Sequence, residues 1–143
     1  MTPTDLATAL RAAFTQAPPL FEHEAQLQAI LGERLEAVLD ANHVDHAPRL
    51  HLYRELVLTK RDRLDFLVGY SPLWSATPMG TAIEVKVGGS LSDLTRQLAR
   101  YAESERITGL LVVTTKDRHR QLPPSLSGKP IACLCLADFT LGF

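Results

Sequence analysis

Two apolar, strand-like stretches of this chain carry charged residues where a buried strand should have none. Asp65 stands in the run 63–68, and Glu84 and Lys86 alternate with aliphatic residues in the run 81–87. Because successive strand side chains point to opposite faces, Glu84 and Lys86 should share one face. Buried charges cost free energy unless they are paired or bind a metal. We therefore interpret these residues as a divalent-metal site for phosphodiester hydrolysis.

Two helical stretches direct further polar side chains at these strands. Glu24 lies three and seven residues before Leu27 and Leu31, which places it on the buried stripe of a helix. Gln97 lies four residues before Tyr101 and faces the sheet from the helix that follows the Glu84 strand. Glu24 is expected to add a carboxylate and Gln97 to hold the site in place. The alternative for Glu24 is a first-turn acid that the helix dipole stabilises. The alternative for Gln97 is an interfacial glutamine that is hydrogen-bonded to the backbone.

Ordinary ion pairing offers a second interpretation of the charged strand residues. Asp65 can form a salt bridge with Arg63 or Lys86, and Glu84 can pair with Lys86 on a solvated sheet face. In regular alternation, Leu64 and Phe66 would share the face opposite Asp65.

Hydrophobic periodicity predicts the element order α-α-β-β-β-α-β-β. The expected helices cover 4–15, about 21–39 and about 91–104, and the expected strands cover 51–59, 63–68, 81–87, 107–115 and 131–136. The helix between the third and fourth strands makes those two strands parallel, and the earlier strands form antiparallel hairpins. We expect an α/β fold with a mixed central sheet flanked by helices, in a single domain over residues 1–143.

Composition places few limits on function. The 143 residues are 45% hydrophobic and 22% charged, with a formal net charge of −1, so the chain has no overall basic character. Cys133 and Cys135 alternate with leucines and are expected to be buried strand residues. No stretch has the pattern of a signal peptide or the length of a membrane span, which predicts a cytoplasmic protein without membrane contact.

The arrangement of these residues resembles the PD-(D/E)xK nuclease superfamily. The resemblance lies in a helix with Glu24, a hairpin strand with Asp65, a strand with Glu84-Val85-Lys86, and a helix with the sequence 96–101. It implies a restriction-endonuclease-like α-β-β-β-α-β core over about residues 21–115, with an extra N-terminal helix and C-terminal strand. Leu64 stands where the family motif has proline.

The resemblance also implies roles for individual residues. Asp65, Glu84 and Glu24 would bind Mg²⁺ or Mn²⁺, and Lys86 would position the attacking water and stabilise charge on the phosphate. Gln97 belongs to a Gln-x-x-x-Tyr pattern found in several branches of the family.

The implied activity is a metal-dependent endonuclease or exonuclease, with DNA favoured over RNA as substrate. Nucleic-acid contacts are expected from Tyr101, Arg96, Arg100, Lys116, Arg118 and Arg120. Trp74, in the loop between two of the strands, would stack on a base or pack beneath its loop. A homodimer would enlarge the contact with nucleic acid. The alternative function is a non-catalytic binding or structural subunit of a larger DNA-processing or phage-related assembly.

Overall fold

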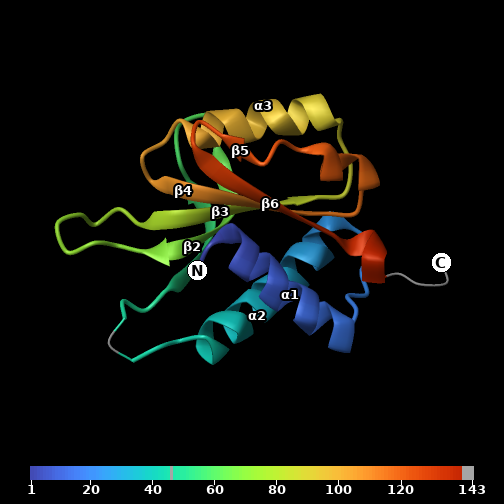
Figure 1. Ribbon diagram of the computed structural model, residues 1–143, viewed down its shortest axis with the longest axis horizontal. Coiled ribbons are helices and arrows are strands. Elements are labelled where there is room, and N and C mark those ends of the chain that lie inside the picture. The colour runs from blue at the N-terminus through green and yellow to red at the C-terminus, as the bar shows by residue number, and fades with distance from the viewer. Residues whose placement is uncertain (46, 140–143) are drawn as a thin grey trace.

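A mixed sheet of six strands separates two helical layers. The computed structural model describes residues 1–45 and 47–139. Helices α1 and α2 cover one face of the sheet, and α3 covers the other (Figure 1). The elements are α1 (Pro3–Gln16), α2 (Glu24–Ala41), β1 (His51–Val57), β2 (Arg63–Tyr70), β3 (Met79–Lys86), α3 (Leu91–Ala102), β4 (Ile107–Thr114), η1 (Asp117–Gln121), β5 (Ser125–Leu126), β6 (Lys129–Cys135) and η2 (Leu136–Phe139). The predicted α/β class with a mixed sheet is therefore confirmed.

The strands lie in the order β1-β2-β3-β4-β6-β5. Strands β1, β2 and β3 are antiparallel neighbours, whereas β3, β4 and β6 run parallel. The predicted crossover through α3 is thus present, with Glu84 opposite Val112 and Lys86 opposite Thr114. The carboxyl ends of β3 and β4 consequently meet at one edge of the sheet.

Each face of the sheet buries its own core. Ile83 and Val85 face α1 and α2, together with Leu111 and Val113. Ala82, Glu84 and Lys86 of β3 face α3. The buried residues of α3 are Leu94, Leu98, Tyr101 and Ala102. The alternation expected for the 81–87 strand is confirmed, and it directs Glu84 toward α3.

Helix α3 begins at Leu91, as the sequence suggested, whereas α1 and α2 begin at other residues. Helix α1 begins at Pro3, and not at residue 4, because Thr2 caps it through a capping box with Asp5 and Pro3 fits the first helical position. Helix α2 begins at Glu24 after the cap residue His23, and not near Phe21. None of the helices in residues 1–45 and 47–139 combines the length and the apolar character that a bilayer crossing requires.

Two glycines allow β2 and β3 to approach closely at the end far from Glu84. Gly69 and Gly80 pair across the strands, and a Cβ on Gly69 would lie 1.8 Å from the Met79 carbonyl oxygen. A Cβ on Gly80 would lie 2.0 Å from the Val68 carbonyl oxygen. Backbone atoms cannot yield as a flexible side chain does, so the sheet requires glycine at both positions.

Gly69→Ala should therefore lower the free energy of unfolding by about 2 kcal/mol or more, because the strands must separate to admit the methyl group. Gly88→Ala is the matched control, since a Cβ there meets no atom within 4 Å. That control should stay within about 0.5 kcal/mol of the wild type. Urea denaturation of the three proteins measures the difference, and equal stability of both variants would contradict the close packing.

Candidate functional site

The predicted site lies where strands β2 and β3 separate. Their ladder runs from the Tyr70–Met79 pair to the Phe66–Ile83 pair and stops there. Beyond that point two side chains replace the missing backbone partners. The Val85 amide donates to Asp65 Oδ2 at 2.8 Å, and the Asp65 amide donates to Glu84 Oε1 at 3.3 Å. The carboxyl groups of Asp65 and Glu84 thereby hold the two strands together.

The regular alternation of β2 is broken at Asp65. Leu64 packs in the α3 core and Phe66 in the α1–α2 core, so the prediction that they share one face was wrong. The residue opposite Asp65 is Glu55 of β1, which lies between the Arg54–Phe66 and Leu56–Leu64 pairs. Glu55 has a φ of 48°, in the left-handed region that residues with a Cβ rarely occupy. The distortion on both strands turns the Asp65 side chain toward β3.

Glu84 is buried beneath α3 with only 3% of its surface exposed. Its Oε1 atom accepts a hydrogen bond from the Tyr101 hydroxyl at 3.1 Å. Gln97 Nε2 donates to that hydroxyl at 2.8 Å, so Gln97 reaches the carboxyl group through Tyr101. The spacing of Gln97 and Tyr101 predicted that both would face the sheet, and the structure adds the relay between them.

Burial makes Glu84 a weak acid. Loss of solvent, followed by the nearby charge of Asp65, raises the Glu84 pKa to about 8, although the charge of Lys86 opposes the shift. The Asp65 pKa is also raised, chiefly by burial, while hydrogen bonds from Val85 and Glu84 oppose that shift. At neutral pH the pair therefore retains a proton on Glu84, which donates to Asp65.

Helix α2 supplies a partner for this pair that the sequence interpretation did not select. Gln28 Nε2 donates to Asp65 Oδ1 at 3.3 Å. Glu24 is half-buried one turn earlier, and within residues 1–45 and 47–139 no hydrogen bond or ion pair joins it to either carboxyl group. Those residues also contain no set of three acidic, histidine or cysteine side chains placed to hold a metal. The structure thus brings together two of the three predicted metal ligands.

Lys86 lies beside the pair but is not neutralised by it. Its charge lowers the pKa of both Asp65 and Glu84, yet none of the ion pairs in the described part of the chain includes it. The alternatives of an Asp65–Arg63, Asp65–Lys86 or Glu84–Lys86 salt bridge are not observed there. Lys86 lines a hollow of about 80 Å³ with Gln97 and the 88–90 loop. This volume exceeds the roughly 10–15 Å³ that a cavity needs to hold one water molecule.

Most of the predicted nucleic-acid contacts are already engaged within the protein. Tyr101 is 1% exposed, so its assignment as a surface contact was wrong, because the ring is needed in the core. Three arginines form ion pairs: Arg96 with Asp93, Arg100 with Asp62, and Arg120 with both Asp117 and Asp138. Lys116 and Arg118 form no ion pair among the described residues.

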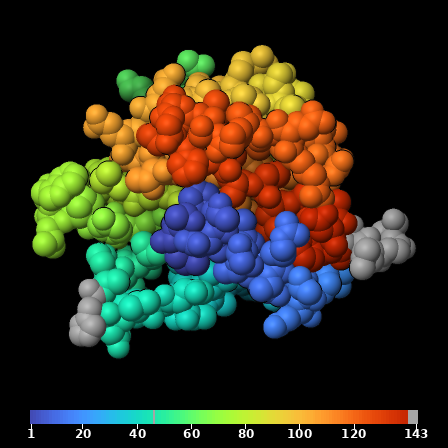
Figure 2. Space-filling view, viewed as in Figure 1, coloured from blue at the N-terminus to red at the C-terminus, as the bar shows by residue number. Residues whose placement is uncertain are grey.

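Trp74 lies at the opposite end of the sheet from Asp65 and Glu84. Its loop joins the far ends of β2 and β3 and projects from the left side of the molecule (Figure 2). Trp74 is 79% exposed, so it neither reaches the acidic pair nor packs beneath its loop.

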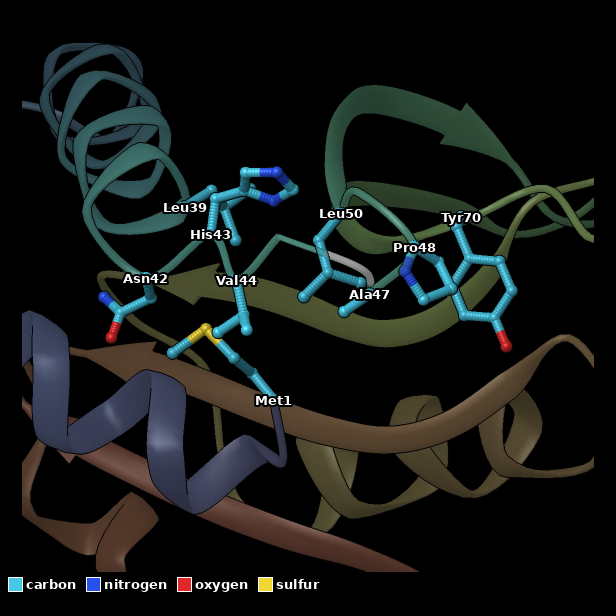
Figure 3. A pocket seen from close by; sticks show the side chains of 9 residues that line it. All are labelled: Met1, Leu39, Asn42, His43, Val44, Ala47, Pro48, Leu50 and Tyr70. Carbon is cyan, nitrogen blue, oxygen red and sulfur yellow. The ribbon is translucent and has the colours of Figure 1, made fainter.

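An apolar pocket of about 380 Å³ also lies at that far end (Figure 3). Met1, Leu39, Val44, Leu50 and Tyr70 are among the residues that line it. His43 and Tyr70 bring the titratable rings, and no carboxyl group is among its described lining residues, so the pocket has the surface of a binding hollow.

The donor chemistry of the acidic pair fits a hard divalent cation. Mg²⁺ commonly takes one or two carboxylates and keeps several waters, so two protein ligands are sufficient. Asp65 and Glu84 face each other closely enough for a hydrogen bond between their side chains, so both carboxyl groups are at hand for one small cation. Gln28 and Tyr101 then hold one carboxyl group each.

Comparison with known proteins adds no assignment: the chain matches no family model, no curated protein and no solved structure.

The raised pKa of Glu84 predicts how stability depends on pH. The folded protein binds the Glu84 proton more tightly than the unfolded chain, whose pKa is near 4.5. The free energy of unfolding should therefore fall as pH rises from about 5 to 8, by at most about 1.4 kcal/mol per pH unit. Glu84→Gln imitates the protonated acid. Over this pH interval its free energy of unfolding should therefore fall by roughly 1 kcal/mol or more less than that of the wild type.

Urea denaturation at several pH values tests this expectation. Glu33→Gln, at an exposed position of α2, is the control and should keep the wild-type slope. Parallel curves for wild type and Glu84→Gln would contradict a protonated, buried Glu84.

Proposed function

We propose that this protein is a metal-dependent nuclease that hydrolyses phosphodiester bonds, with DNA favoured as substrate. The observation that carries the proposal is a buried and a half-buried carboxyl group beside an amine that forms no ion pair within residues 1–45 and 47–139. Asp65 and Glu84 bridge two separated strands, and Lys86 lies next to them. A purely structural ion pair would place the amine against a carboxylate, which is not the arrangement observed.

The residues divide the work of such a site. Asp65 and Glu84 hold Mg²⁺ or Mn²⁺, which when bound polarises a phosphoryl oxygen as a Lewis acid. Lys86 offsets the negative charge that develops on the phosphate and orients the attacking water. Gln97 and Tyr101 fix the Glu84 carboxyl group, and Gln28 fixes that of Asp65.

The order of the elements supports the same proposal. From Glu24 to Thr114 the chain runs α2-β1-β2-β3-α3-β4, which is the α-β-β-β-α-β order of the restriction-endonuclease-like core. Asp65 lies on the second strand of this series, and Glu84 and Lys86 lie on the third. The PD-(D/E)xK resemblance assigns the metal and the lysine to these same positions.

A non-catalytic subunit is the second candidate function. The exposed Leu73 and Trp74, in the loop between β2 and β3, favour it. Large apolar side chains that remain in solvent are typical of a surface that binds another macromolecule. Under this proposal the acidic pair would only hold β2 and β3 together.

Nuclease assays separate the two proposals. With Mg²⁺ or Mn²⁺ the wild type should cleave at least one of linear duplex DNA, single-stranded DNA or RNA. Asp65→Asn and Lys86→Ala should each lower the rate by about 100-fold or more, since the first removes a metal ligand and the second removes the positive charge at the reacting phosphate. Both variants should keep a cooperative thermal transition.

Asp40→Asn and Lys129→Ala serve as controls, because Asp40 pairs with Arg49 and Lys129 donates to the Ser104 carbonyl, both outside the site. Their rates should equal that of the wild type. A folded wild type that cleaves none of these substrates would reject the nuclease and favour the subunit.

A further inference from the structure

Three cationic side chains without counter-ions gather at the carboxyl ends of β3 and β4. They are Lys86, Lys116 and Arg118, and none takes part in an ion pair within residues 1–45 and 47–139. The acids of the neighbouring segments are engaged elsewhere, because Asp93 pairs with Arg96 and Asp117 with Arg120. This edge is therefore locally positive in a chain whose net charge is −1.

Hydrogen bonds fix the segments that carry these cations. Lys86 lies opposite Thr114, and the Thr114 hydroxyl accepts from the Lys116 amide at 3.0 Å. Arg118 Nε donates to the Gly89 carbonyl oxygen at 2.8 Å. Arg118 thus binds the loop after β3 through one nitrogen, and its two terminal nitrogens form no hydrogen bond among the described residues.

Buried His119 connects the two segments. Its Nδ1 lies 2.6 Å from the Thr114 hydroxyl, and its Nε2 lies 3.1 Å from the Gly89 carbonyl oxygen. The carbonyl can only accept, so Nε2 carries the proton and Nδ1 accepts from the hydroxyl. The His119 pKa is lowered chiefly by burial and further by the charges of Arg118, Lys86 and Lys116. All three cations therefore lie near one imidazole ring.

We propose that Lys86, Lys116 and Arg118 form a phosphate-binding patch for the backbone of a nucleic-acid strand. The inference rests on the proposed function in one respect, namely that Lys86 contacts the phosphate at the acidic pair. Lys116 and Arg118 then bind a further phosphate of the same strand. The free guanidinium nitrogens of Arg118 suit two parallel hydrogen bonds to phosphate oxygens.

A membrane surface is a poorer partner for this patch. Membrane-binding surfaces combine basic residues with exposed apolar side chains. The exposed large apolar residues of the described chain are Met1, Leu20, Val44, Val57, Tyr70, Leu73 and Trp74. None belongs to the segments that carry the three cations, so the patch offers charge alone, as contacts to a nucleic-acid backbone require.

Fluorescence anisotropy with labelled 20-nucleotide single-stranded and duplex DNA tests the patch in EDTA, where no metal-dependent cleavage interferes. Between 50 and 200 mM KCl the wild type should show a linear fall of log K with log salt. Lys116→Ala/Arg118→Ala should lower the magnitude of that slope by about 2 and weaken binding at 50 mM KCl at least about tenfold.

Arg49→Ala/Lys129→Ala is the charge-matched control, since both residues lie away from this edge and each has an internal partner. It should keep the wild-type slope. Equal losses in both double variants, or no loss in either, would overturn the patch, as would binding of an acidic peptide in preference to both DNA probes. Binding that depends on Lys116 and Arg118 in a protein without cleavage activity would uphold the patch and reject the nuclease.

Discussion

The interrupted ladder between β2 and β3 is the constraint on which the rest of the structure depends. Buried backbone groups must be hydrogen-bonded, and at this point the neighbouring strand does not supply the partners. Carboxyl oxygens of Asp65 and Glu84 accept from the amides of Val85 and Asp65 instead. The same contacts that stabilise the sheet therefore hold two acids together in a poorly solvated position, and burial raises the pKa of both.

The change from antiparallel to parallel pairing at β3 places the charged groups at one edge of the sheet. The carboxyl ends of β3 and β4 carry Lys86 and Lys116, and α3 returns over Glu84. Ligands of open α/β sheets commonly bind at such an edge. The opposite end holds the apolar pocket and the exposed Trp74. Lys86 and Lys116 thus lie at the opposite end of the strands from the exposed Trp74.

Hydrophobic spacing was sufficient to predict the helices, most of the strands and the direction of Glu84. It could not predict the break at Asp65, because Glu55 adopts a left-handed conformation without the glycine that usually marks one. Nor could it distinguish Glu24 from Gln28, which lie one turn apart on the same helical stripe. Only the packing of α2 against β2 decides that Gln28 reaches Asp65. The separation of Trp74 from Asp65 and Glu84 could be predicted from the sequence, because a hairpin loop lies far from residues at the other ends of its strands.

Calorimetric titration with Mn²⁺ shows whether Asp65 and Glu84 together bind a divalent cation, as we propose. We expect one binding event for the wild type, which Glu84→Gln weakens by about tenfold or more and Glu33→Gln leaves unchanged. Absence of binding to the folded wild type, or equal affinity in Glu84→Gln, would exclude a metal site at this pair.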